Sequence, residues 1–193
     1  MTPTESAPIR VSQASTLVGP LTLVVDPSAV GDRGETTYGA VIASGFASIE
    51  DIAERLTPEQ KQRLRVESAP PPELASLIAA YNDGDVDALD DVSVRQSGGE
   101  FMHRAWVALR GVKAGETDSY TGLATRAGRP RAVRAAGTAC ATNMVAPFVP
   151  CHRIVRSDGS LGGYYYGLDV KEALLAHERE WSGSSEAREE PPT

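Results

Sequence analysis

Hydrophobic residues recur with two different periods on the two sides of the polar run Gln96-Ser-Gly-Gly99. Before this run, residues 19–25 and 36–46 are rich in β-branched and aromatic side chains, and 19–25 also alternates, which favours strands. After it, residues 101–112 place their apolar side chains on one face of a helical repeat. We expect an α+β chain, in which the strands lie before this run and an amphipathic helix follows it.

We therefore place an N-terminal α/β domain at residues 1–97 and a mainly helical domain at residues 98–181. Two short helices are expected in the first domain, at 48–56 and 72–81. Residues 1–13 are expected to form a loose arm. The polar, acidic segment 182–193 is expected to be a disordered tail.

Composition favours a cytoplasmic protein that acts without a membrane. No apolar stretch of the 193 residues approaches the roughly 20 that a membrane helix needs, and the first residues lack the pattern of a signal peptide. The chain has two cysteines and three histidines, without the spacing of metal ligands. Two free thiols in a reducing compartment, with no metal and no cofactor, are the simplest interpretation.

Charge is distributed unevenly along the chain. The net charge is −7, yet residues 119–157 contain six arginines and no acidic residue, so this segment carries +6 and the remainder −13. Such asymmetry favours an anionic partner. A chance cluster of surface arginines is the alternative.

The same segment has the pattern of a helix-turn-helix. Ser119 can cap a helix that runs to Ala127, Gly128 can end it, and Pro130 suits the first turn of a second helix. The buried stripe of the second helix is expected at Val133, Ala136, Gly137 and Cys140. Its outward side chains are then Arg131, Arg134 and Thr138.

Cys151 follows a β-rich run that starts at Val145. A buried structural cysteine is the ordinary alternative to a nucleophile. A nucleophilic thiol needs a base and an electropositive setting, which His152 and Arg153 can supply. Because neighbours on a strand point to opposite faces, His152 is expected to act on the sulfur through a bridging water.

The motif Pro150-Cys-His-Arg-Ile154 resembles the active-site motif of the O6-alkylguanine-DNA alkyltransferases, also called methylated-DNA–protein-cysteine methyltransferases. Further motifs follow in the order and spacing of that family. The resemblance covers roughly residues 101–178, and the first half matches weakly, through Gly19-Pro-Leu-Thr-Leu23. The further motifs are Gly115-Glu-Thr-Asp-Ser-Tyr120, Ala127-Gly-Arg-Pro130, Arg134-Ala-Ala-Gly137, Asn143, Gly159-Ser-Leu-Gly-Gly-Tyr164 and Lys171-Glu-Ala-Leu-Leu-Ala-His-Glu178.

The resemblance implies a small α/β domain with an antiparallel sheet, followed by a helical domain that bears the helix-turn-helix. It implies DNA repair by direct, stoichiometric and irreversible transfer of the alkyl group from O6-alkylguanine to a cysteine, after base flipping, with O4-alkylthymine as an alternative substrate. The partner would be double-stranded DNA and the protein a monomer. The zinc-bearing members of the family use N-terminal cysteines, which this chain lacks, so no zinc is implied.

Catalytic roles carry over by position in the motifs. Cys151 is the acceptor, His152 takes its proton through a water, and Glu178 holds His152 in the useful tautomer. Tyr120 donates to the base and protonates the leaving guanine. Asn143 bridges the recognition helix and the active-site strand, although a plain helix C-cap is an alternative for it.

Binding roles carry over in the same way. Arg134 matches the arginine finger that fills the gap left by the flipped nucleotide. The main-chain carbonyls of Cys151 and Ile154 are expected to accept from the guanine amino group. The other expected DNA contacts are Arg129, Arg131, Thr138 and Arg153, and the expected pocket residues are Cys140, Ile154, Tyr164, Tyr165 and Tyr166.

Four positions depart from the family pattern. Met144 stands where the family usually has proline, and Ala146 replaces another frequent wall residue. Tyr165 and Tyr166 stand where small residues are usual. Two rings beside the pocket predict efficient transfer of methyl and poor transfer of bulky groups such as benzyl.

Three other functions compete with alkyl transfer. A non-catalytic alkyltransferase-like protein would lack the acceptor, against which Cys151 argues. A transcription regulator would leave the Cys-His-Arg run and Glu178 unexplained. A cysteine hydrolase would need a separate histidine, for which the sequence offers no candidate.

Overall fold

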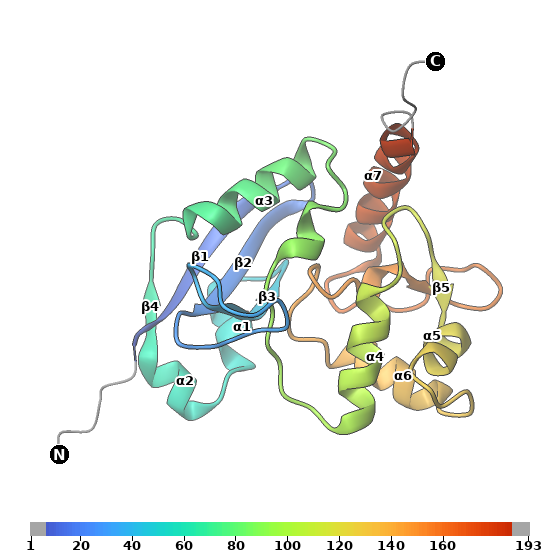
Figure 1. Cartoon of the computed structure of the whole chain (residues 1–193), viewed down its shortest axis with the longest axis horizontal. Coiled ribbons are helices and arrows are strands. Elements are labelled where there is room, and N and C mark those ends of the chain that lie inside the picture. The colour runs from blue at the N-terminus through green and yellow to red at the C-terminus, as the bar shows by residue number, and fades with distance from the viewer. Residues whose placement is uncertain (1–6, 187–193) are drawn as a thin grey trace.

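The computed structural model describes residues 7–186, and its first half is built on one sheet (Figure 1). The strands lie in the order β3-β2-β1-β4. Antiparallel pairing joins β1 to β2 and β2 to β3, whereas β4 runs parallel to β1. The expected antiparallel sheet is therefore confirmed, with one parallel edge strand. The strands are β1 (Ile9–Thr16), β2 (Gly19–Asp26), β3 (Ala40–Gly45) and β4 (Leu64–Val66).

The loose arm expected at residues 1–13 is wrong from Ile9 onward. Ile9 and Val11 are buried, β1 pairs with β2 from Arg10 to Thr16, and Ile9 pairs with Leu64 of β4. Serine and glutamine interrupt the apolar residues of this strand, so its sequence reads as polar although two neighbouring strands satisfy its backbone. Residues 1–6 of the expected arm lie outside the described residues.

Helices cover both faces of the sheet. Side chains alternate along β2, so neighbouring residues of this strand belong to different cores. Leu23 and Val25 join a core with α3 (Pro72–Asn82). Val24 joins a second core with α1 (Ile49–Glu54). Ser48 caps α1 as its sequence predicts, since its side chain accepts from the Asp51 N–H at 3.0 Å. Two short elements complete this half, namely α2 (Pro58–Arg63) and η1 (Ala88–Asp91).

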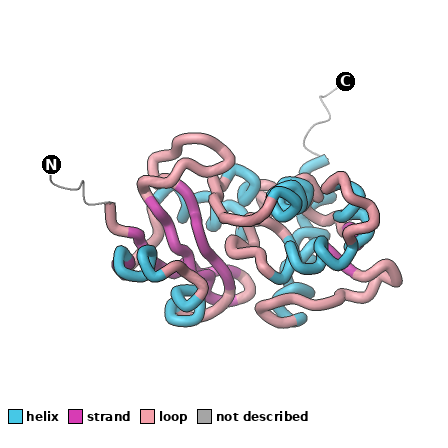
Figure 2. The backbone as a smooth tube through the Cα atoms, turned by 90° about the horizontal axis from the view of Figure 1, so that it is seen from below, coloured by secondary structure: helices cyan, strands magenta, loops and turns pink. Residues whose placement is uncertain are grey.

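Helices dominate the second half. In Figure 2 the long strands lie on one side of the molecule, whereas helices lie on both. One minimal parallel pair, β5 with β6, is the exception. The long α7 continues to Glu186, so residues 182–186 of the expected disordered tail are helical, and residues 187–193 lie outside the described part. The elements are α4 (Glu100–Arg110), β5 (Asp118–Ser119), α5 (Tyr120–Arg126), α6 (Val133–Ala141), η2 (Cys151–Arg153), β6 (Ile154–Val155) and α7 (Leu168–Glu186).

The two helices α5 and α6 pack together across a short turn. Ser119 caps α5 by accepting from the Gly122 N–H at 3.0 Å, and Gly128, with φ +78°, lies just beyond its end. The second helix begins at Val133, so Pro130 lies in the turn and not in the first helical turn as expected. The arrangement agrees with two helices and a tight turn, and its use as a DNA-reading helix-turn-helix stays a prediction.

One core crosses from the sheet into the helices, so the two halves are in close contact. It contains side chains of β2 and α3 together with side chains of α4, α5 and α6. At the edge of the sheet the Ser44 N–H donates to the Met144 carbonyl at 2.7 Å, and its hydroxyl donates to the Ala146 carbonyl at 2.8 Å. The expected boundary between residues 97 and 98 stays a prediction. Between residues 7 and 186, no helix has the length and apolar character needed to cross a membrane.

Candidate active site

Cys151 is the first residue of η2, a short 3-10 helix that follows the buried segment 145–150. A strand was expected there, and the structure corrects this. The Cys151 side chain is buried, and the Asn143 amide donates to its Sγ at 3.2 Å and to the Val149 carbonyl at 2.7 Å. The thiol is therefore held from the end of α6, which is the helix that carries the exposed Arg134.

Asn143 connects several segments through its side chain. Its Oδ1 accepts from the Val145 N–H at 3.1 Å and from the Gln96 side chain at 3.3 Å. The alternative of a helix C-cap is wrong, because Thr142 is the C-cap of α6 and no non-glycine residue between 7 and 186 has a positive φ. The side chain bridges α6 to the cysteine segment, as the resemblance implies.

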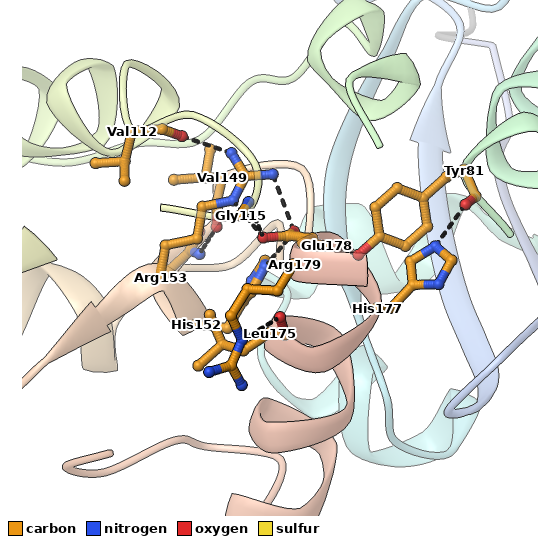
Figure 3. A network of polar contacts seen from close by, with 11 residues as sticks. Tyr81, Val112, Gly115, Val149, His152, Arg153, Leu175, His177, Glu178 and Arg179 are labelled. Atoms are coloured by element: carbon orange, nitrogen blue, oxygen red, sulfur yellow. Dashed lines mark hydrogen bonds and ion pairs between the residues drawn. The ribbon is translucent and has the colours of Figure 1, made fainter. Parts of the chain in front are cut away.

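His152 and Glu178 form a buried pair (Figure 3). His152 Nε2 lies 2.8 Å from Glu178 Oε1, and both side chains are almost completely inaccessible to solvent. The other ring nitrogen, Nδ1, is buried and lacks a hydrogen-bond partner among the described residues. With the proton on Nε2, held by the carboxylate, Nδ1 is the acceptor that a general base needs.

Arg153 completes this cluster, which corrects its expected role as a DNA contact. Its side chain is buried, its Nε donates to Glu178 Oε2 at 3.0 Å, and its Nη2 donates to Oε1 at 3.0 Å. Its Nη1 donates to the Val112 carbonyl at 2.6 Å. Burial alone would raise the pKa of Glu178, but His152 and Arg153 outweigh it and lower that pKa to about 2.

The thiol and the imidazole are both neutral at rest. Burial raises the pKa of the Cys151 thiol, and the Asn143 amide and the Lys171 charge offset this only in part. Burial also lowers the pKa of His152, against the opposing effect of Glu178. Since the Arg153 guanidinium is neutralised by Glu178, it does not supply the electropositive setting expected for a resting thiolate. A thiolate at Cys151 would therefore require a proton acceptor nearby.

A cavity of about 260 Å³ opens beside Cys151. Its size is near the lower end of the roughly 300–1,000 Å³ of typical ligand pockets, which suits one small planar group. Burial raises the pKa of Tyr120, so its hydroxyl keeps a proton that it can donate. The lining residues are Tyr120, Gly137, Cys140, Ala141, Cys151, Gly163, Tyr164 and Tyr165.

Two expected pocket residues do not line this cavity. The Tyr166 hydroxyl donates to the Ser44 carbonyl at 3.0 Å and accepts from Arg55 Nη1 at 3.0 Å, so its ring is anchored against the sheet. The Ile154 side chain is fully buried, and its carbonyl accepts from Lys171 Nζ at 2.5 Å. Of the adjacent tyrosines, Tyr165 lines the cavity and is largely exposed.

Sequence reasoning missed a buried cation that holds the pocket loops. Lys171 Nζ donates to the carbonyls of Ile154, Leu161 and Gly163, and burial lowers the pKa of its ammonium group. This ties the cysteine segment to the loop that carries Tyr164. A signal existed, because the buried stripe of α7 contains two charged members at helical spacing. The stripe is Lys171, Leu174, Leu175 and Glu178.

The remaining sequence-predicted residues lie on the exposed side of α6 and of the preceding turn. Arg129, Arg131, Arg134 and Thr138 are all exposed, as expected. Gly137 and Cys140, from the same helix, line the cavity. The turn and α6 together thus present exposed cations, while α6 also forms a wall of the cavity.

Comparisons with known proteins identify relatives of this chain. Residues 100–180 match the family model described as 6-O-methylguanine DNA methyltransferase, DNA binding domain. The chain is 38% identical over 114 residues to the methylated-DNA–protein-cysteine methyltransferase of Salmonella typhimurium, covering 59% of this chain and 67% of that protein. It is 44% identical over 104 residues to the bifunctional transcriptional activator/DNA repair enzyme Ada of Escherichia coli, covering 54% of this chain and 29% of Ada.

A solved structure matches over nearly the whole chain. The crystal structure of Mycobacterium tuberculosis OGT in complex with DNA superposes with a TM-score of 0.67 at 26% identity, covering 89% of this chain and 93% of that one. The sequence matches are shorter, and the chain spans less than a third of the length of Ada.

Proposed function

The chain belongs to the methylated-DNA–protein-cysteine methyltransferase family, and on that premise we propose that it repairs O6-alkylguanine in duplex DNA by taking the alkyl group onto Cys151. One observation carries the proposal. A buried thiol opens onto a cavity and is held by Asn143, while the adjacent His152 has a free Nδ1 and is oriented by Glu178. This is the orienting logic of a catalytic triad.

The reaction is a displacement at carbon. The bond between Cys151 Sγ and the alkyl carbon forms as the bond from that carbon to guanine O6 breaks. The thiol proton passes through a water to His152 Nδ1, and the imidazolium is stabilised by Glu178. The leaving guanine takes a proton from Tyr120, which can regain one from solvent. The thiol has lost one proton and the guanine has gained one.

The base must leave the duplex to reach the sulfur, because Cys151 is buried. The exposed arginines of α6 and of the turn before it support binding to the phosphate backbone, and Arg134 is proposed to occupy the gap left by the flipped nucleotide. Since α6 also lines the cavity through Gly137, the flipped base would enter directly beside this helix.

The proposal includes a single round of reaction by a monomer. The thioether formed on Cys151 is not a leaving group under physiological conditions, so each molecule acts once. Both cysteines of the chain are free thiols. A nucleophilic thiol needs a reducing compartment, which favours the cytoplasm.

Transfer of label from DNA to protein tests the proposal. Duplex DNA carrying a radiolabelled O6-methyl group is incubated with excess protein, and we expect the label to move to protein until the DNA is exhausted. With excess DNA, transfer should stop at one methyl per protein. A Cys151→Ala variant should bind the same DNA and accept nothing. Binding without transfer by the native chain would instead favour a non-catalytic DNA-binding protein.

A further inference from the structure

A tyrosine of the N-terminal half reaches the catalytic cluster. Tyr81 lies near the end of α3, is buried, and its hydroxyl donates to Glu178 Oε1 at 3.3 Å (Figure 3). Burial is the main reason that the pKa of this phenol is raised, so the hydroxyl stays protonated and acts as a donor.

Contacts with His177, the residue before Glu178, also hold Tyr81 in place. His177 Nε2 donates to the Tyr81 carbonyl at 2.7 Å, and the two rings lie 5.0 Å apart. The end of α3 is therefore joined to α7 through both the main chain and the side chain of Tyr81. The phenol cannot drift away from the carboxylate without breaking the contact with His177.

The hydroxyl competes for the oxygen that orients His152. Glu178 Oε1 accepts from His152, Arg153 and Tyr81, while Oε2 accepts from Arg153 and, at 3.4 Å, from the Gly115 N–H. Every donor withdraws negative charge from the carboxylate. The more charge Oε1 gives to other donors, the less it stabilises a proton on the imidazole.

We propose that Tyr81 is a positioning residue through which the N-terminal half keeps His152 neutral before the reaction, by holding and partly neutralising Glu178 Oε1. The inference rests on the proposed function, because it concerns the base of the same reaction. A neutral imidazole has a free Nδ1, whereas an imidazolium cannot take the thiol proton.

Other ionisable groups face this cluster and remain in place when Tyr81 changes. Cys151 and Arg153 come from η2, Glu178 and Lys171 from α7, Tyr164 from the preceding loop, and Asp90 from η1. Removing only the Tyr81 hydroxyl leaves more charge on Oε1 and so raises the pKa of His152. Because transfer requires neutral His152, the acidic limb of the pH–rate profile then moves to higher pH.

The test compares Tyr81→Phe with a matched control, Tyr38→Phe. Tyr38 is also buried, it lies just before β3, and its hydroxyl accepts from the Ser93 N–H at 2.8 Å. Single-turnover methyl transfer is measured from pH 5 to 9. For Tyr81→Phe we expect the acidic limb to move up by about half a pH unit, the effect of one neutral hydrogen bond. The limb of Tyr38→Phe should coincide with that of the native protein.

The outcomes separate the two proposals. Absence of transfer by the native protein would refute the proposed function. Native transfer with coincident limbs for Tyr81→Phe and native protein would overturn the role of Tyr81 alone. If Tyr81→Phe does not fold, 3-fluorotyrosine at position 81 makes the phenol a stronger donor, and the limb should move to lower pH. The His152 imidazole titration, followed by NMR, must move in the same direction as the limb in each variant.

Discussion

Replacing Glu178 with glutamine should destabilise the fold strongly, although the change is nearly isosteric. The carboxylate is completely buried and neutralises Arg153, which is itself buried. Glutamine keeps an oxygen that can accept but removes the charge. The Arg153 guanidinium would then lie in the interior without a counterion, a situation that costs about 3–5 kcal/mol in other proteins.

The lowered pKa of Glu178 gives a second measure of how much its charge contributes to the free energy of unfolding. Its fall from the ordinary 4.5 to about 2 corresponds to about 3 kcal/mol at neutral pH, at roughly 1.4 kcal/mol per unit. Since the folded-state pKa is below the unfolded value, this stability is fully present above about pH 4.5 and is lost as pH falls toward 2. Domains are commonly stable by only about 5–15 kcal/mol, so the loss is a large fraction.

Urea unfolding at pH 7 measures the effect, with Glu172→Gln, an exposed position on the same helix, as the control. We expect Glu178→Gln to lose about 3 kcal/mol and the control to stay within about 0.5 kcal/mol of the native protein. Between pH 5 and 3 the difference in the free energy of unfolding between the native protein and Glu178→Gln should become smaller. A loss below about 1 kcal/mol at pH 7 would refute the view that Glu178 neutralises Arg153 in the interior.

Two further predictions concern the DNA-facing side of the site. Arg134→Ala should impair transfer from duplex more than transfer from single-stranded substrate. The control is Arg126→Ala, which should alter neither rate, because the native Arg126 side chain pairs with Asp118 at 2.8 Å. Equal losses on both substrates for Arg134→Ala would make Arg134 an ordinary phosphate contact. Tyr165→Gly should raise the rate of benzyl relative to methyl transfer because this ring lines the cavity, and Tyr166→Gly should leave that ratio unchanged; a gain only in the second variant would contradict the assigned wall.

Local sequence patterns predict the features that depend only on adjacent residues, such as helix caps. Ser48 and Ser119 cap helices because a side-chain oxygen can satisfy a nearby backbone N–H, and this depends on a few adjacent residues. The outward positions of Arg134 and Thr138 on α6 follow from helical periodicity alone. The strand at Ile9 was missed because its stability comes from pairing with β2 and β4, which no local pattern reveals.

Contacts between distant segments explain the misplaced site residues. Arg153 is a surface cation by its residue type, and only the position of Glu178 on α7 makes it an interior one. Tyr166 is assigned to the pocket by its position in the family pattern, yet it bonds to Ser44 and Arg55 in the first half of the chain. Tyr81 sits in a helix predicted from the sequence, but nothing local indicates that its hydroxyl reaches Glu178.

The central claim is that Cys151 accepts the alkyl group, and Cys140 provides the sharpest internal comparison because both thiols border the same cavity. Burial raises the pKa of each thiol, but only the Cys151 sulfur accepts a hydrogen bond from Asn143 and adjoins a histidine with a free Nδ1. Peptide mass spectrometry after reaction with O6-methylguanine duplex should find one added methyl group, on the peptide containing Cys151. Methylation of Cys140, or of neither cysteine, would contradict the account.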